Sequence, residues 1–156
     1  MGLYKGEGNA SWAAEIDAIQ AQLGREGVVM DSFGQALSHL AVSTAVTFID
    51  LPIWTAPAPE NKAREVLLTS GSEHAANSGA YWTFRPYLRD SNGKDRPLAA
   101  ELSTASEKLQ EKVPYTWTVD RDIKSGEIVF MRISWSGSPS DLYGLSFEVK
   151  TERGAI

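Results

Sequence analysis

The feature that most constrains the fold of this chain is an alternation of apolar and polar residues that runs through residues 80–151. Near the C-terminus the apolar positions are Tyr143, Leu145, Phe147 and Val149, and Gly, Ser, Glu and Lys occupy the positions after them. A period of two predicts a β-strand with one buried and one exposed face. We therefore expect a strand over residues 143–151 that buries these four side chains.

The alternating segments are separated by turn-forming sequences at residues 77–79, 91–93, 124–126 and 137–139, each rich in Asn, Ser, Gly or Pro. Between them we expect strands at residues 43–51, 65–70, 81–89, 98–104, 115–120, 127–136 and 143–151. The proline-rich segment 52–59 is expected to be an extended crossing, because proline cannot donate to a sheet ladder. Seven strands, or eight if that segment contributes one, predict a mainly β chain, an antiparallel β-sandwich with the jelly roll as the favoured form.

The N-terminal residues follow different patterns. Residues 1–10 are glycine-rich and polar, which predicts an extended arm. Residues 11–23 have helical spacing, and the Ser32-x-x-Gln35 capping box predicts a second short helix over residues 32–40. We therefore divide the chain into an N-terminal arm and helical anchor or oligomerisation segment, residues 1–42, and a β-sandwich domain, residues 43–156.

A helix as short as residues 11–23 is marginal in water, so its apolar side must pack on something. Packing on its own domain is one alternative, and packing on another chain is the one we favour. The residues expected to anchor the protein to a capsid, or to hold an oligomer together, are Leu3, Tyr4, Trp12, Ile16, Ile19 and Leu23.

Composition excludes several classes of function. The net charge of −5 and the pI of about 5.0 give no electrostatic basis for binding nucleic acid or an anionic membrane. The chain has no Cys, which excludes disulfides and thiolate chemistry. No apolar run reaches the roughly 18 residues of a transmembrane helix, and the first residues lack the apolar segment of a signal peptide.

No catalytic or metal-binding constellation is evident. The two histidines, His39 and His74, lie in no catalytic motif and are too few for a zinc site. Oxygen-bearing side chains between Asp90 and Asp95 invite a calcium interpretation, but Asn92-Gly93 is already explained by a hairpin turn, which we favour. We expect a protein that is not an enzyme and has no cofactor or metal.

Aromatic residues are the best candidates for a binding surface. On the expected strand 81–89, Trp82 and Phe84 share the face predicted to fill the core, together with Trp135 from another strand. The opposite face carries Tyr81, Arg85 and Tyr87. Together with Tyr115, these residues form a possible recognition surface that could stack on sugar rings or dock a neighbouring subunit.

The order of strand and turn sequences over residues 66–152 resembles that of a small β-sandwich that recurs in virion proteins of tailed bacteriophages. The segments that carry this resemblance are AANSGAYWTF (75–84), LRDSNG (88–93), LAAELST (98–104), PYTWTV (114–119), IKSGEIVFMRI (123–133) and LSFEVK (145–150). The resemblance to capsid decoration and head-fibre proteins implies a structural virion protein on the capsid surface, made in the host cytoplasm. It also implies a homotrimer bound to the major capsid protein, or to another virion protein, through an N-terminal segment. The alternative is a tail-fibre or baseplate module that recognises host glycans through Tyr81, Tyr87 or Tyr115.

Overall fold

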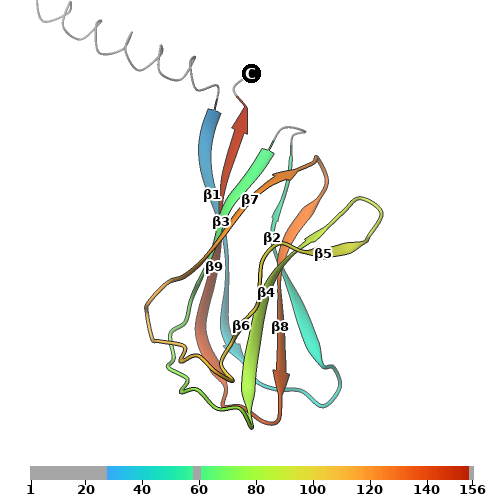
Figure 1. Ribbon diagram of the computed structural model, residues 1–156. Coiled ribbons are helices and arrows are strands. Elements are labelled where there is room, and N and C mark those ends of the chain that lie inside the picture. Colours follow the sequence, from blue (N-terminus) through green and yellow to red (C-terminus); the bar gives the residue numbers. More distant parts are fainter. Residues whose placement is uncertain (1–27, 58–60, 155–156) are drawn as a thin grey trace, which may run out of the picture.

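The computed structural model describes residues 28–57 and 61–154, which form two antiparallel sheets (Figure 1). One sheet has the strand order β1-β9-β3-β7, and the other has the order β2-β8-β4-β5, with β6 also paired to β4. The strands are β1 (Val28–Leu40), β2 (Phe48–Thr55), β3 (Asn61–Thr69), β4 (Tyr81–Arg89), β5 (Asp95–Pro97), β6 (Leu102–Ser103), β7 (Tyr115–Ile123), β8 (Ile128–Ser136) and β9 (Leu142–Gly154).

Strand pairing is nested along the chain. The first strand pairs with the last, β1 with β9, and the next pairs inward are β2 with β8, β3 with β7 and β4 with β5. Successive pairs alternate between the two sheets, so the chain crosses from one layer to the other as it winds. The predicted mainly β architecture and the antiparallel sandwich are confirmed.

The core lies between the two sheets and is built from the inward positions of the alternating strands. Trp82 and Phe84 of β4 are fully buried, as predicted, and Trp135 packs edge-on against Trp82 with 5.6 Å between ring centroids. The indole N–H of Trp82 donates to the carbonyl of Ser140 at 2.8 Å, and that of Trp117 donates to the carbonyl of Ala100 at 2.8 Å. Both large side chains therefore enter the core without leaving a polar group unsatisfied.

Residues 28–40 correct the prediction of a second helix over residues 32–40. They form β1, which is paired with β9 almost without interruption, and the described residues contain no helix. The apolar residues that fit a helical seam also fit a strand, because Phe33 and Leu37 lie opposite Val149 and Leu145 on the inner face. Gly34 is costly inside a helix but is tolerated in the strand. A strand of the sandwich thus begins ahead of the boundary expected at residue 43.

Tyr143 corrects a second prediction. Leu145, Phe147 and Val149 are buried as expected, but Tyr143 is 51% exposed and Leu142 takes the buried position. Gly144, between Tyr143 and Leu145, has a φ of 59°, which breaks the alternation of β9. A side chain at Gly144 would also lie 3.2 Å from the Cα atom of Gly71 in the adjoining loop.

Two further predictions are wrong in detail. Of the strand expected at residues 98–104, only the two residues of β6 form, and the three-residue strand β5 lies just before that range. β2 continues through Pro52 instead of ending before it. Pro52 is tolerated because β2 is an edge strand, and the register of β2 shifts between Pro52 and Trp54.

The predicted extended arm and first helix lie in residues 1–27, outside the described residues. The six expected anchoring residues, Leu3 to Leu23, lie there too. Within residues 28–57 and 61–154, no helix is long and apolar enough to cross a lipid bilayer.

Candidate functional site

The outward face of β2, β8 and β4 brings together aromatic and charged side chains from three strands. Each strand contributes one aromatic-x-charged triplet: Phe48-Ile-Asp50 in β2, Phe130-Met-Arg132 in β8 and Tyr87-Leu-Arg89 in β4. The register places Asp50 opposite Arg132 and Phe130 opposite Tyr87. We call the six triplet ends, together with Asp95 of β5, the outer cluster.

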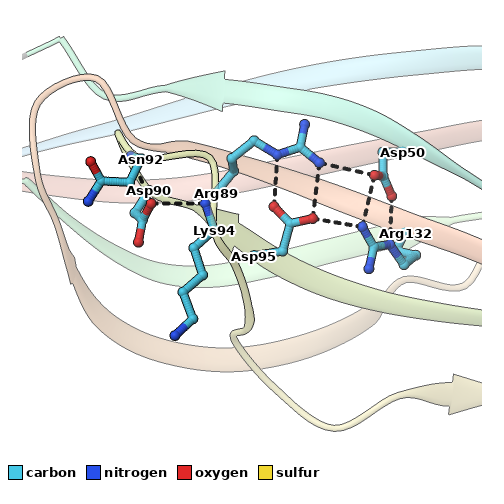
Figure 2. Close-up of polar contacts among 7 residues, drawn as sticks. All are labelled: Asp50, Arg89, Asp90, Asn92, Lys94, Asp95 and Arg132. Atoms are coloured by element: carbon cyan, nitrogen blue, oxygen red, sulfur yellow. Dashed lines mark hydrogen bonds and ion pairs between the residues drawn. The ribbon is translucent and has the colours of Figure 1, made fainter.

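Two arginines and two aspartates of the outer cluster form a closed network (Figure 2). Arg132 donates from Nε and Nη2 to the two carboxylate oxygens of Asp50, at 2.8 and 2.9 Å. Arg89 donates from Nε and Nη2 to the two carboxylate oxygens of Asp95, at 2.7 and 3.1 Å. Each arginine also donates to the other aspartate. Nη2 of Arg132 lies 2.9 Å from Oδ2 of Asp95, and Nη2 of Arg89 lies 3.2 Å from Oδ2 of Asp50. The two carboxylates are therefore bridged twice.

Aromatic rings surround the network. The guanidinium carbon of Arg132 lies 4.5 Å from the ring centroids of both Phe48 and Tyr87. Phe130 is fully buried although it points away from the core, because Tyr87 stacks on it at 5.6 Å and the Arg89 guanidinium lies 4.6 Å from its centroid. This geometry combines cation–π attraction with bidentate ion pairing, which suits arginine and not lysine.

The network shifts the pKa values of Arg132 and Asp95 in the directions expected for stable ion pairs. The hydrogen bond to Asp50 raises the pKa of Arg132, and partial burial opposes this rise. The hydrogen bond from Arg89 lowers the pKa of Asp95, and Arg132 adds to this effect. The network joins two guanidinium groups to two carboxylates, so its formal charges cancel. The cluster is therefore a rigid, locally neutral surface with no spare cation for an anionic ligand.

The Asp90–Lys94 loop forms the hairpin turn that the sequence predicts. One carboxylate oxygen of Asp90 accepts from the backbone N–H groups of Asn92 and Lys94, at 2.9 and 3.0 Å (Figure 2). The bond from Lys94 is the main reason that the pKa of Asp90 is lowered. Gly93 supplies the left-handed residue of the turn, with a φ of 82°. Among the described residues, no group of three or more His, Asp or Glu side chains could hold a metal ion.

The two histidines lie apart from the outer cluster. His74 is buried, and its ring nitrogens lie 3.0 Å from the Ser72 hydroxyl and 3.2 Å from the Ser140 hydroxyl. Burial lowers the pKa of His74. The Ser72 hydroxyl also accepts from the backbone N–H of Tyr143 at 3.1 Å, so these contacts join two loops. Neither ring nitrogen of His74 has a carboxylate partner that would orient it as a catalytic base. His39 pairs with Asp141 at 2.8 Å.

The structure brings three of the predicted recognition residues to one face and separates the fourth. Tyr81, Arg85 and Tyr87 are half-buried on the outward face of β4. Tyr115 lies on β7 of the other sheet, in edge-on contact with Trp117 at 4.7 Å, and burial raises its pKa. A surface that uses Tyr115 together with Tyr87 is therefore not formed.

No protein-family model matches this chain, and no curated protein matches it significantly. Solved structures do match it. A chain in the acid-stable capsid of the Helicobacter pylori bacteriophage KHP30 is 11% identical, with a TM-score of 0.52 over 81% of this chain and 90% of that chain. The VP2 subviral particle of infectious bursal disease virus is 12% identical, with a TM-score of 0.43 over 81% of this chain and 33% of that chain. The Drosophila NLP core is 11% identical, with a TM-score of 0.39.

This chain spans only about a third of the length of the VP2 chains that it matches. The phage KHP30 chain differs in this respect, because the match covers nearly all of it. At this level of identity the likeness shows the fold alone. The fold is a β-sandwich of the kind found in a viral capsid.

Proposed function

We propose that this chain is a non-enzymatic structural protein of a tailed-phage virion, which decorates the outside of the capsid as a trimer. Its partner would be the major capsid protein, or another virion protein, bound through residues 1–27, the part of the expected anchor segment that precedes β1. The observation that supports this most is the fold match to a chain of the phage KHP30 capsid, which covers 90% of that chain. The matched sandwich therefore accounts for nearly all of that phage chain.

The strand topology supports the finer assignment to the jelly-roll class. The first strand pairs with the last and the second with the next to last, and successive pairs alternate between the two sheets. This pattern results when a long hairpin is wound into a sandwich. The jelly roll recurs in viral capsid domains. The same architecture also hosts other functions, so topology supports the proposal without deciding it.

The outer cluster favours a passive surface over glycan recognition. Sugar binding through Tyr87 needs an open ring face, but this ring already contacts Phe130 and the guanidinium of Arg132. Arg132 is itself held by Asp50 and Asp95. Sugar stacking on Tyr87 would have to displace an arginine that makes three hydrogen bonds.

Trimeric attachment would work through avidity. Three N-terminal segments on one trimer multiply modest contacts, so that a short segment holds firmly without a large single interface. A protein that binds the assembled shell but not its free subunits stabilises the shell by mass action.

Deletion of residues 1–24 tests the proposal. The truncated protein retains every described strand, so it should fold and show the far-ultraviolet circular dichroism of a β-sandwich. It should no longer co-sediment with shells that bind the full chain. Normal decoration by the truncated protein would show that the anchor is elsewhere, and full-length protein that never binds shells would refute the capsid role itself.

A further inference from the structure

The four sheet edges of the described sandwich are not equally protected. An open edge offers unpaired backbone groups to other strands, and proteins usually block it with proline, lysine, a bulge or a short strand. β2 carries Pro52 and a register shift, β5 has three residues and ends in Pro97, and β7 is interrupted by a register shift opposite Ala63. β1 is the exception. It has 13 residues, with no proline and no lysine.

The hydrogen bonds of β1 show which of its backbone groups face the open edge. The backbone N–H of Ala36 donates to the Gln35 side-chain oxygen at 3.3 Å and so points away from β9. Successive residues of an antiparallel strand bond to alternate sides. The even-numbered residues 32, 34, 36 and 38 therefore present their backbone N–H and C=O groups on the open edge.

Exposed large apolar side chains are concentrated on β1, on β2 and in the segment between these strands. Six large apolar side chains are exposed among the described residues, and four of them lie on β1, on β2 or in the segment between these strands: Met30, Phe33, Val46 and Phe48. Phe33 stacks on Trp54 across the gap between the two sheets, with 5.5 Å between ring centroids, and is still 37% exposed. An apolar edge with unpaired backbone groups is suited to adding a strand.

The sequence of β1 is complementary to itself in one antiparallel register. With Gln35 opposite Gln35 of a second copy, the paired residues nearest the axis match in size and polarity: Phe33 with Leu37, Ser32 with Ser38 and Gly34 with Ala36. The even-numbered residues then face each other, as hydrogen bonding between the two open edges requires. A shift that centres the pairing on Gly34 places Asp31 opposite Leu37 and Met30 opposite Ser38, and the match is lost.

We infer that β1 is a binding site for β1 of a second copy of this chain, in antiparallel pairing about a two-fold axis at Gln35. The pairing joins two four-stranded sheets into one continuous sheet and covers Phe33 of both copies. A two-fold interface is self-complementary, so one surface serves both partners. It is compatible with a trimer held by residues 1–27, which precede β1, because it would then link copies from different trimers. The inference does not depend on a role in a virion.

Disulfide trapping tests the register directly, since the chain has no cysteine of its own. In the proposed pairing, residue 35 lies opposite itself in a non-hydrogen-bonded pair with Cα atoms about 4.5 Å apart, within the range of a disulfide. Full-length Gln35→Cys should therefore form a covalent dimer under mild oxidation. Ser32→Cys is the matched control, because two copies of residue 32 would be separated by about 20 Å along the strands.

We expect Gln35→Cys to cross-link at least ten-fold faster than Ser32→Cys on non-reducing gels. Adding Ala36→Pro to Gln35→Cys should suppress cross-linking, because it removes an edge donor that β9 does not use. Circular dichroism would verify that this double variant keeps its fold. Equal rates for the two cysteine variants would overturn the inference, and so would cross-linking that Ala36→Pro leaves unchanged in a folded protein.

Discussion

Replacing Asp50 with alanine tests whether the outer cluster stabilises the sandwich. The change removes three hydrogen bonds, two from Arg132 and one from Arg89, and leaves Arg132 held only by Asp95. The side chains of Asp50 and Arg132 are 20% and 24% exposed, between a surface pair and a buried one. Surface pairs contribute about 0.2–1 kcal/mol, and breaking a buried pair costs about 3–5 kcal/mol. We therefore expect the free energy of unfolding to fall by about 2 kcal/mol.

Urea denaturation followed by tryptophan fluorescence measures this loss, because Trp54 and Trp82 are buried. For a chain of this size the melting temperature should fall by about 4–8 °C. Glu73→Ala is the matched control. It breaks an ion pair with Lys108 in which both side chains are about half exposed, and should change the stability by less than about 0.5 kcal/mol.

A double-mutant cycle with Arg132→Met separates the ion pair from general effects of either substitution. We expect a coupling energy of about 1 kcal/mol or more between Asp50 and Arg132. Additive effects, or an Asp50→Ala loss no larger than that of Glu73→Ala, would refute the stabilising role of the network.

Three further substitutions probe other parts of the fold. Phe130→Ala should lower the free energy of unfolding by about 3–5 kcal/mol in urea denaturation, because this outward ring is fully buried, whereas Phe48→Ala at a 43% exposed position should cost much less. Gly144→Ala should lower the free energy of unfolding by about 1–2 kcal/mol from the left-handed backbone, and further because the new Cβ approaches Gly71. The loss should exceed that of Gly93→Ala, where the backbone is also left-handed but the space is open, and equal losses would contradict the role of the contact. Burial lowers the pKa of His74, so the unfolded chain binds a proton more readily and stability should decline as the pH falls below about 6.5. His74→Gln should reduce this decline in urea titrations at pH 7.5 and 5.5, and an unchanged pH dependence would contradict the assignment.

The sequence predicts the sandwich and most strands well, because alternation and turn chemistry are local signals. β4 is predicted with its bounds, and Gly93 occupies a left-handed turn position, as Asn92-Gly93 suggests. β1 is mistaken for a helix because residues spaced 3 and 4 apart fit both structures, and only pairing with β9 decides between them. Tyr143 is misplaced because the conformation of Gly144 depends on its contact with a distant loop.

The outer cluster could have been found in part from the sequence. The aromatic-x-charged triplet recurs in three expected strands, and its charged residues are one aspartate and two arginines. The sequence does not show that the triplets are adjacent, because this requires the β2–β8 and β8–β4 registers. Those registers depend on strand pairing between residues as far apart as Phe48 and Ser134, which no local pattern encodes.

The contacts of residues 1–27 in the assembled state test the central proposal most directly. Electron cryomicroscopy of shells decorated with the full chain would locate the sandwich and trace these residues. The proposal predicts that residues 1–27 lie on capsid subunits or on sister copies around a three-fold axis, with the sandwich projecting outward. A single copy whose residues 1–27 pack only against their own sandwich would contradict it.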